Sequence, residues 1–312
     1  DPFCGSGTTL IESTIAGFQS IGWDLNPFAI YLSNAKISAL HSNPTKLSIL
    51  SKNIISTYHR NDYDLASRSK KSVDYLEKLR NGDLSRSEER RLGLPWSDAL
   101  VRRSRLAVQG TLMAARMALK DGFAANLAGG THHAFPDHGE GFCVLNDMAV
   151  TTKILMLEGE VKRTLIIDLD VHQGNGTAAA FRDDLNTFTF SMHCAKNYPF
   201  VKENSNLDVE LNDGTNDAEY LDILHTHLPK VLNLAQPDII FYLAGVDVVA
   251  GDRYGRINLS REGLLKRERY VLGLIRELSI PTVILMAGGY ASTPELTADF
   301  HADVHRVADE LN

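Results

Sequence analysis

The sequence has few cysteines and no long hydrophobic run. Only Cys4, Cys143 and Cys194 occur among its 312 residues, and none of them forms the C-x-x-C pair of a thiolate metal site. Three widely spaced cysteines also argue against a disulfide framework, so we expect a reducing, cytoplasmic environment. No apolar run approaches the ~20 residues that a membrane-spanning helix needs. We therefore expect neither a membrane partner nor a signal peptide.

An excess of positive charge is also lacking. The 32 lysines and arginines are outnumbered by 39 aspartates and glutamates, which gives a formal net charge of −7. Nucleic-acid binding through bulk electrostatics is therefore not expected. Internal repeats and low-complexity tracts are absent as well. A hydrophobic content of 44% and a charged content of 23% are ordinary for a globular chain of one large or two modest domains.

Residues 1–60 begin with a glycine-rich stretch, DPFCGSGTT, followed by an amphipathic segment and a short apolar run that ends at Asp24. Glycines allow a backbone to approach a ligand closely, and an acid about 20 residues later can bind a ribose hydroxyl. The stretch resembles motif I of DNA methyltransferases, which implies S-adenosylmethionine binding near Gly5, Gly7 and Asp24. The catalytic motif of those enzymes, Asp or Asn followed by Pro-Pro and an aromatic residue, is missing. We therefore expect a fragment without methyl transfer.

A polar, charged segment follows, and we place the domain boundary within it. Residues 61–74 are predicted to be a charged junction and residues 75–312 a second domain. Ser85 and Glu88 have the spacing of a capping box, which predicts the start of a short helix.

Apolar and amphipathic segments alternate from Ser97 onward. This alternation predicts an α/β fold with a mainly parallel sheet that is flanked by helices on both faces. The predicted helices cover residues 98–120, 146–157, 176–182, 218–234, 262–278 and 294–311. The predicted strands cover residues 124–128, 164–169, 187–192, 238–244 and 281–286.

Polar residues capable of catalysis follow four of these strands. They are His132 with His133, the run from Asp168 to His172, Asp247, and Tyr290. Parallel strands bring their carboxyl ends to one edge of a sheet, so we expect these residues to meet there.

The residue types indicate metal-assisted amide hydrolysis. Asp170 and His172 are two residues apart and can point the same way, and Asp247 provides a third ligand for a divalent metal. Three protein ligands leave a position open, as in catalytic zinc sites, where the metal lowers the pKa of water and polarises a carbonyl. His132 and His133 are suited to general base and acid roles, and the Tyr290 hydroxyl to oxyanion stabilisation.

The motifs GGTHHAFPDHGEGFCVLND, DLDVHQGNG, AGVD and GGY resemble those of the zinc-dependent histone deacetylase family, which has the arginase/deacetylase fold. The Gly-Thr-His-His and His-Gln-Gly-Asn-Gly runs are most similar to the class IV branch and its bacterial relatives. The resemblance begins near Tyr75. It implies an eight-stranded parallel sheet and hydrolysis of an acetyl or longer acyl group from a lysine side chain or a similar amine.

The resemblance also implies residue roles. Asp170, His172 and Asp247 match the ligands of Zn²⁺, with Fe²⁺ as the alternative ion. The catalytic positions that match are His132, His133 and Tyr290, with Asp168 as the partner that orients His132. Gly141 and Phe142 match the loop lining the acyl-lysine tunnel. A structural K⁺ site is matched by Asp168, Asp170, His172, Ser191 and Met192.

Two departures from the family pattern stand out. Asn175 replaces the aspartate that faces the second histidine in many class I relatives. Because an amide carries no charge, we expect His133 to be less basic than in those relatives. In addition, the family's first strand has no match, and the methyltransferase-like segment stands in its place.

Two further functions fit the sequence. The chain could be an S-adenosylmethionine-dependent DNA methyltransferase fragment fused to an inactive module that binds acyl-lysine. Alternatively, the second domain alone could bind acyl-lysine without turnover. The expected partners are an acyl-lysine protein or a small acylated amine.

Overall fold

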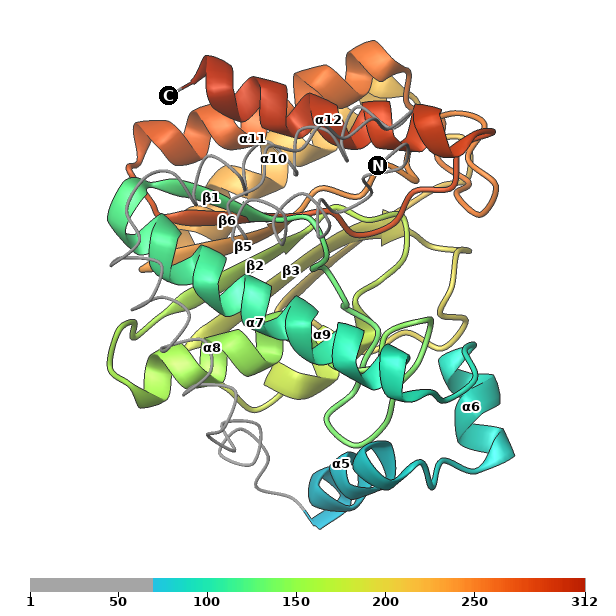
Figure 1. Ribbon diagram of the computed structural model, residues 1–312. Helices are drawn as coiled ribbons and strands as arrows, with labels where there is room; N and C mark the ends of the chain where they lie inside the picture. Colours follow the sequence, from blue (N-terminus) through green and yellow to red (C-terminus); the bar gives the residue numbers. More distant parts are fainter. Residues whose placement is uncertain (1–69, 312) are drawn as a thin grey trace, which may run out of the picture. The chain divides into compact units, whose positions relative to one another are not determined.

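The fold described below is that of residues 70–311 in a computed structural model of the chain. The methyltransferase-like segment 1–60, including Gly5, Gly7 and Asp24, lies outside the described residues, as does most of the predicted junction 61–74. Within residues 70–311 the chain forms a single parallel sheet between two layers of helices, as predicted (Figure 1).

The sheet has six strands in the order β1-β6-β5-β2-β3-β4, and every neighbouring pair is parallel. The strands are β1 (Phe123–Asn126), β2 (Thr164–Asp168), β3 (Thr187–Cys194), β4 (Leu207–Leu211), β5 (Ile239–Leu243) and β6 (Thr282–Leu285). The order places β2 in the interior of the sheet, between β5 and β3. The resemblance implies eight strands, and the described residues contain six.

Two groups of helices cover the two faces of the sheet (Figure 1). One face carries α7 (Asp98–Asp121), α8 (Asp147–Leu157) and α9 (Asn175–Phe181). The other carries α10 (Asp217–Ala235), α11 (Arg261–Glu277) and α12 (Pro294–Glu310). These bounds agree with the predicted helices to within one residue at each end.

The interior strands are apolar along their whole length because both of their faces are buried. In β2, Leu165 and Ile167 pack with α10, α11 and α12, whereas Ile166 packs with α7, α8 and α9. All three side chains are fully buried. A continuous run of β-branched and leucine residues therefore predicts this strand well.

A smaller apolar cluster lies beside the N-terminal half of α7. It contains side chains from α5 (Lys70–Asn81) and α6 (Arg86–Leu92), including Tyr75 and Leu92. The predicted capping box is present: Ser85 Oγ accepts from the Glu88 backbone N–H, and Glu88 Oε2 accepts from that of Ser85. Helix α5 begins inside the range predicted as the charged junction, and it buries Tyr75 and Leu79 in this cluster.

The edge strand β4 was not predicted from the sequence. Its segment, LDVEL, is short and mostly half-buried, and it pairs with β3 alone. A short edge strand that carries two acids lacks the long apolar run by which the interior strands are recognised.

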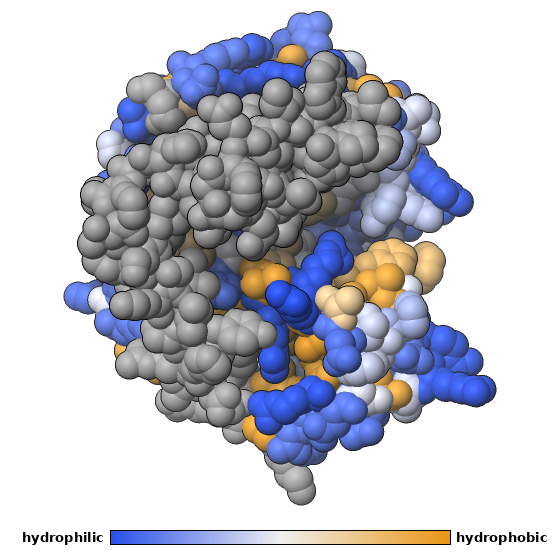
Figure 2. Space-filling model, in the orientation of Figure 1, coloured by the Kyte–Doolittle hydropathy of each residue, from blue (hydrophilic) through white to orange (hydrophobic). Residues whose placement is uncertain are grey.

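Hydrophilic side chains cover the outer surfaces of α5, α6, α11 and α12 on the face seen in Figure 2. Among the most exposed large apolar side chains are Phe142, Phe200 and Val201, which belong to loops at the carboxyl ends of β1 and β3. Over residues 70–311, none of the helices combines the length and the hydrophobicity that a membrane crossing requires.

A buried ion pair on α11 packs against the carboxyl end of β2. Arg267 and Glu268 of α11 are 0% and 1% exposed, and their side chains lie 2.5 Å apart. Tyr242 of β5 donates a hydrogen bond to Glu268, while Arg267 donates one of 3.2 Å to the carbonyl of Leu169. The pair therefore fixes the backbone at the point where β2 passes into the loop that follows it.

We expect Arg267→Met to lower the free energy of unfolding by about 3–5 kcal/mol, because it leaves the Glu268 carboxylate buried without a counter-charge. Lys266→Met is the matched control, since Lys266 pairs with Glu262 on the same helix in an exposed position. Urea unfolding of both variants measures the difference. Equal stabilities would show that the buried pair does not contribute in this way.

Candidate active site

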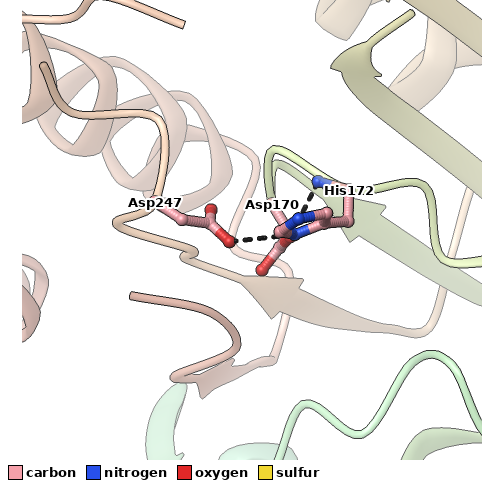
Figure 3. Close-up of side chains that lie close together, drawn as sticks. All are labelled: Asp170, His172 and Asp247. Carbon is pink, nitrogen blue, oxygen red and sulfur yellow. Dashed lines mark hydrogen bonds and ion pairs between the residues drawn. The ribbon is translucent and has the colours of Figure 1, made fainter. Parts of the chain in front are cut away.

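Three side chains with metal-binding atoms meet at the carboxyl ends of β2 and β5. Asp170 and His172 belong to the loop after β2, and Asp247 to the loop after β5 (Figure 3). His172 Nδ1 lies 3.0 Å from Asp170 Oδ1 and 3.2 Å from Asp247 Oδ2, and one potential ligand atom from each residue lies within 4.8 Å of the others. Because β2 and β5 are paired in register, loops that are 75 residues apart in sequence emerge side by side.

The electrostatics of this cluster favour a cation. Asp170 and Asp247 are 1% and 0% exposed. Burial and the charge of Asp170 raise the pKa of Asp247 to about 7. Asp247 Oδ1 accepts the Val171 backbone N–H, whereas its buried Oδ2 forms no hydrogen bond and has only the 3.2 Å ion-pair contact with His172 Nδ1. A carboxylate oxygen without a hydrogen bond, beside a second carboxylate and an imidazole, fits a divalent metal with nitrogen and oxygen ligands.

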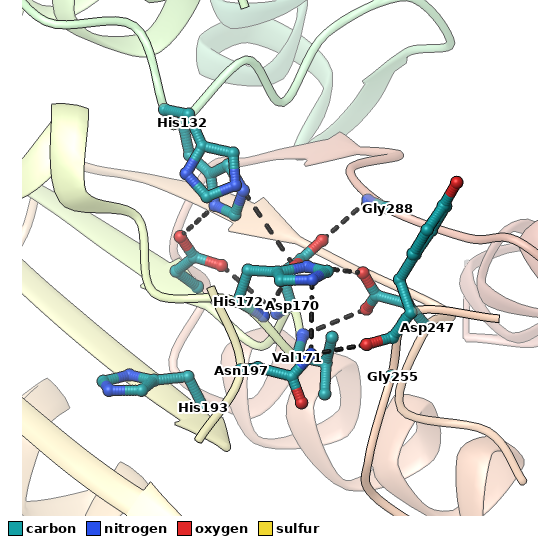
Figure 4. Close-up of polar contacts among 12 residues, drawn as sticks. His132, Asp170, Val171, His172, His193, Asn197, Asp247, Gly255 and Gly288 are labelled. Atoms are coloured by element: carbon teal, nitrogen blue, oxygen red, sulfur yellow. Dashed lines mark hydrogen bonds and ion pairs between the residues drawn. The ribbon is translucent and has the colours of Figure 1, made fainter. Parts of the chain in front are cut away.

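The backbone of Gly288 closes the cluster on one side (Figure 4). Its N–H donates a 2.7 Å hydrogen bond to Asp170 Oδ2. A Cβ atom at this position would lie 2.1 Å from Asp247 Oδ2 and 2.7 Å from Asp170 Oδ2. Only glycine allows the loop after β6 to come so close. The sequence showed the Gly-Gly-Tyr motif but not this packing requirement.

His132 lies beside the cluster and is 4% exposed. Its Nδ1 forms a 2.7 Å hydrogen bond with Asp168 Oδ2, and its Nε2 lies 4.0 Å from Asp170 Oδ1. Burial by itself lowers the pKa of His132, but the charges of Asp168 and Asp170 outweigh burial and raise the pKa to about 9. Asp168 thus occupies the orienting position expected from the resemblance.

His133 packs next to His132, with their ring centroids 4.1 Å apart. Its Nδ1 lies 2.7 Å from Asn175 Oδ1, so the residue at the departure from the family pattern does face this histidine. Burial and the neighbouring charge of His132 hold the pKa of His133 well below its ordinary value. The contact with Asn175 itself acts in the opposite direction and raises this pKa, so the expectation that the amide leaves His133 less basic than in class I relatives stays a prediction.

The loop that carries both histidines is fixed at two points. The Asp147 carboxylate at the start of α8 accepts the backbone N–H of Thr131 at 2.8 Å. On the other side, the Thr177 N–H in α9 donates to the carbonyl of His132 at 3.0 Å. The imidazole positions are therefore set by the first turns of two helices.

Two residues of the site were missed by the sequence interpretation. Glu140 Oε1 accepts hydrogen bonds from Asn175 Nδ2 at 2.7 Å and from the Tyr198 hydroxyl at 2.5 Å. The ring of Tyr198 stands edge-on to that of His133, with 5.0 Å between centroids. Glu140 lies within a motif quoted above, but its partners are 35 and 58 residues away, and no local pattern indicates that they meet.

Gly141 and Phe142 form a tight turn between Glu140 and Cys143. Both central residues have positive φ, 54° and 66°, as in a type I′ turn. A Cβ at Gly141 would come within 2.6 Å of the His133 ring, so this glycine lets the turn press against the histidine. Phe142 is 55% exposed, and its expected role as a lining residue of an acyl-lysine tunnel stays a prediction.

Tyr290 follows β6 and is 40% exposed. Its backbone N–H donates a 2.6 Å hydrogen bond to Asp252, which also accepts the backbone N–H groups of Tyr254 and Gly255. The Tyr254 ring packs edge-on against Tyr290 at 4.8 Å. Partial burial and the charges of Asp170 and Asp247 raise the pKa of Tyr290 to about 12, so its hydroxyl keeps its proton at neutral pH. Asp252 thus caps the loop that carries Tyr254 and fixes the backbone of Tyr290.

The residues of the expected K⁺ site lie close to one another on adjoining strands. Ser191 and Met192 of β3 are buried, and Ser191 pairs in register with Asp168 of β2. The Ser191 hydroxyl contacts His193 Nδ1 at 2.9 Å. Asp170 and His172 follow in the adjacent loop. The K⁺ site stays a prediction, and the residues expected to form it lie on β2, on β3 and in the loop after β2.

The sequence matches the family model of the histone deacetylase domain over residues 31–305. An uncharacterized protein of the cyanobacterium Picosynechococcus is 46% identical over 238 residues, which are 76% of this chain and 79% of that protein. Histone deacetylase 2 of Arabidopsis thaliana is 36% identical over 199 residues, which cover 62% of this chain and 51% of that protein.

The acetoin utilization protein AcuC of Staphylococcus aureus is 29% identical over 238 residues, and 69% of this chain and 61% of AcuC are covered. The chain thus spans half to three-fifths of the length of the two named relatives.

We expect Gly288→Ala to weaken Zn²⁺ binding about 10–100-fold, because the added methyl group collides with two of the three ligands. Gly273→Ala on α11 is the control, since a Cβ there meets no atom within 4 Å. Competition with a chromogenic chelator measures the affinity of each variant. Wild-type affinity in Gly288→Ala would contradict the assignment of this cluster as the metal centre.

Proposed function

We propose that this chain, which belongs to the histone deacetylase family, is a metal-dependent hydrolase that removes an acyl group from a lysine side chain or a similar amine. The observation that carries the proposal is the convergence of Asp170, His172 and Asp247 beside two buried histidines. Acetyl is the acyl group that the family name supports, and longer chains are the extension to be tested.

Asp170, His172 and Asp247 are the residues that would hold the metal, and their oxygen and nitrogen donors fit Zn²⁺, with Fe²⁺ as the alternative. A divalent ion in such a site supplies Lewis acidity toward a carbonyl and acidifies water. The Gly288 N–H keeps Asp170 oriented, and the Val171 N–H does the same for Asp247. These hydrogen bonds restrict the ligands before any ion arrives.

His133 is suited to accept the proton of the attacking water. Its low pKa keeps the ring neutral at physiological pH, and its Nδ1 is occupied by Asn175. His132 has a pKa raised by Asp168 and Asp170, and its hydrogen bond to Asp168 favours the protonated ring. The charge of the protonated ring stabilises negative charge developing on the substrate, and a protonated histidine then donates to the departing amine.

The Tyr290 hydroxyl serves as the donor to the oxygen of the tetrahedral species. Its raised pKa keeps it protonated, which a hydrogen-bond donor requires. Asp252 and Tyr254 support the Tyr290 backbone and ring from the adjoining loop.

An extended, mostly apolar side chain such as acyl-lysine suits the approach to this site. Phe142 is exposed in the turn that Gly141 presses against His133, and the Tyr198 ring stands edge-on to that of His133. Aromatic walls bind a methylene chain through apolar contact without needing a charge. The acyl-lysine proteins and small acylated amines expected from the sequence both present such a chain.

The similarity of Gly-Thr-His-His and His-Gln-Gly-Asn-Gly to class IV deacetylases supports placing the chain near that branch. A K⁺ ion beside Asp168, Ser191 and Met192 completes the proposed set of ions. Its positive charge would stabilise the carboxylates there.

We expect the purified chain to hydrolyse a fluorogenic acetyl-lysine peptide, to lose this activity with a chelator, and to regain it with Zn²⁺. Acetyl- and long-acyl-lysine peptides and an acetylated diamine assayed in parallel identify the preferred substrate. Activity that survives complete metal removal would refute the proposal. Peptide binding without turnover, measured by fluorescence anisotropy, would instead support a non-catalytic module.

We expect His133→Ala to lower kcat about 10²–10⁴-fold, since a general base contributes that much in related chemistry. His227→Ala on α10 is the control, because this histidine lies on a half-buried helix face outside the site. Steady-state assays with matched metal content separate this loss from loss of the ion. A His133→Ala enzyme with wild-type kcat would remove His133 from the mechanism.

We expect Tyr290→Phe to lower kcat about 10²-fold with little change in KM, because only the transition state receives the hydroxyl hydrogen bond. Tyr270→Phe on α11 is the matched tyrosine control. A proportional rise in KM at unchanged kcat would instead assign Tyr290 to ground-state binding.

A further inference from the structure

The side chain opposite His133 is an amide, and an amide has two different ends. Its oxygen only accepts hydrogen bonds, whereas its nitrogen only donates them. The aspartate opposite His132 has two equivalent oxygens and presents an acceptor in either orientation. Asn175 therefore needs a second contact to decide which end His133 meets.

We propose that Glu140 is a positioning residue that fixes the amide of Asn175 and thereby holds the proton of neutral His133 on Nδ1. The role rests on the proposed function, in which His133 accepts a proton, although the orientation of the amide can be tested without turnover.

Glu140 provides an acceptor that only the nitrogen end of the amide can satisfy. Its Oε1 lies 2.7 Å from Asn175 Nδ2, and the carboxylate, when ionised, has no hydrogen to donate. Turning the amide over would place two acceptor oxygens against each other. Asn175 Oδ1 must therefore face His133 Nδ1, which lies 2.7 Å away.

The orientation of the amide determines which nitrogen of His133 is protonated. An acceptor at 2.7 Å requires Nδ1 to carry a hydrogen, so the neutral ring has its lone pair on Nε2. With the amide reversed, Nδ1 would have to accept, the hydrogen would move to Nε2, and the ring could no longer act as a base there. The contact with Glu140 thus selects the active tautomer.

Glu140 is itself held in place from several directions. The Tyr198 hydroxyl donates to Oε1 at 2.5 Å, and His138 Nε2 lies 3.5 Å from Oε2. Its backbone forms two hydrogen bonds with Cys143 across the turn that contains Gly141. The Glu140 side chain is 17% exposed, and its hydrogen bonds outweigh the effect of burial and lower its pKa to about 2. The carboxylate is therefore charged and well placed throughout the physiological pH range.

A double-mutant cycle with residues 140 and 175 tests the inference. We expect Glu140→Ala to lower kcat at least about tenfold with little change in KM, because the amide loses the charged acceptor that sets its orientation. In an Asn175→Asp background the same change should leave kcat unchanged or raise it, since a carboxylate needs no orienting partner and Glu140 then only repels it.

Glu160→Ala, far from the site in an exposed pair with Arg116, is the matched control for loss of a glutamate. Zn²⁺ content and thermal unfolding show that each variant is loaded and folded. The inference would be overturned if Glu140→Ala lowered kcat equally in the wild-type and Asn175→Asp backgrounds. It would also be overturned if Glu140→Ala left kcat unchanged in the protein that retains Asn175.

Nitrogen-15 NMR of the histidine rings tests the tautomer directly in protein supplied with Zn²⁺. The signals of His133 are identified by their absence in His133→Gln. We expect protonated Nδ1 and unprotonated Nε2 in the wild type, and a population protonated on Nε2 in Glu140→Ala. An unchanged tautomer in Glu140→Ala would overturn the inference. Because this experiment needs no substrate, its outcome is independent of whether the chain hydrolyses acyl-lysine.

Discussion

Two carboxylates held next to each other in the protein interior set the conditions for the rest of the site. Asp170 and Asp247 are buried, and their neighbouring positions follow from the in-register pairing of β2 with β5. Two buried like charges destabilise a fold unless a positive charge is close. His172 meets this need in part through contacts of 3.0 and 3.2 Å, and a divalent ion would meet it in full. Binding of a divalent ion at this edge of the sheet would therefore be coupled to folding.

The backbone around these carboxylates packs directly against them and restricts their movement. Gly288 and Gly245 bring backbone against Asp170 where any side chain would collide. Below the site, Arg267 holds the carbonyl of Leu169, which immediately precedes Asp170 in the chain. The ligands are thus fixed by backbone contacts from three separate loops and by the buried guanidinium group of Arg267. Such preorganisation lowers the cost of ordering the site when an ion or a substrate binds.

The parts of this site that depend on local pattern could be predicted from the sequence, and the parts that depend on loop geometry could not. The apolar run of β2 and the i, i+2 spacing after it were enough to predict that Asp170 and His172 face the same way. Strand β4 escaped prediction because an edge strand needs no continuous hydrophobic pattern. The contact between Glu140 and Tyr198 spans 58 residues and depends on a turn with two positive φ angles, which composition and periodicity do not reveal.

The charge of the surrounding side chains explains why an amide is favourable at position 175. Asp168, Asp170 and Asp247 already place three carboxylates in a buried region, and an aspartate at 175 would add a fourth. An asparagine avoids that repulsion but gives up the symmetry of a carboxylate. Glu140 restores a defined orientation while keeping its own charge at the partly exposed rim, where water and the Tyr198 hydroxyl stabilise it. The negative charge thus lies on Glu140 at the rim instead of on residue 175, and the side chain at 175 still accepts the hydrogen bond from His133.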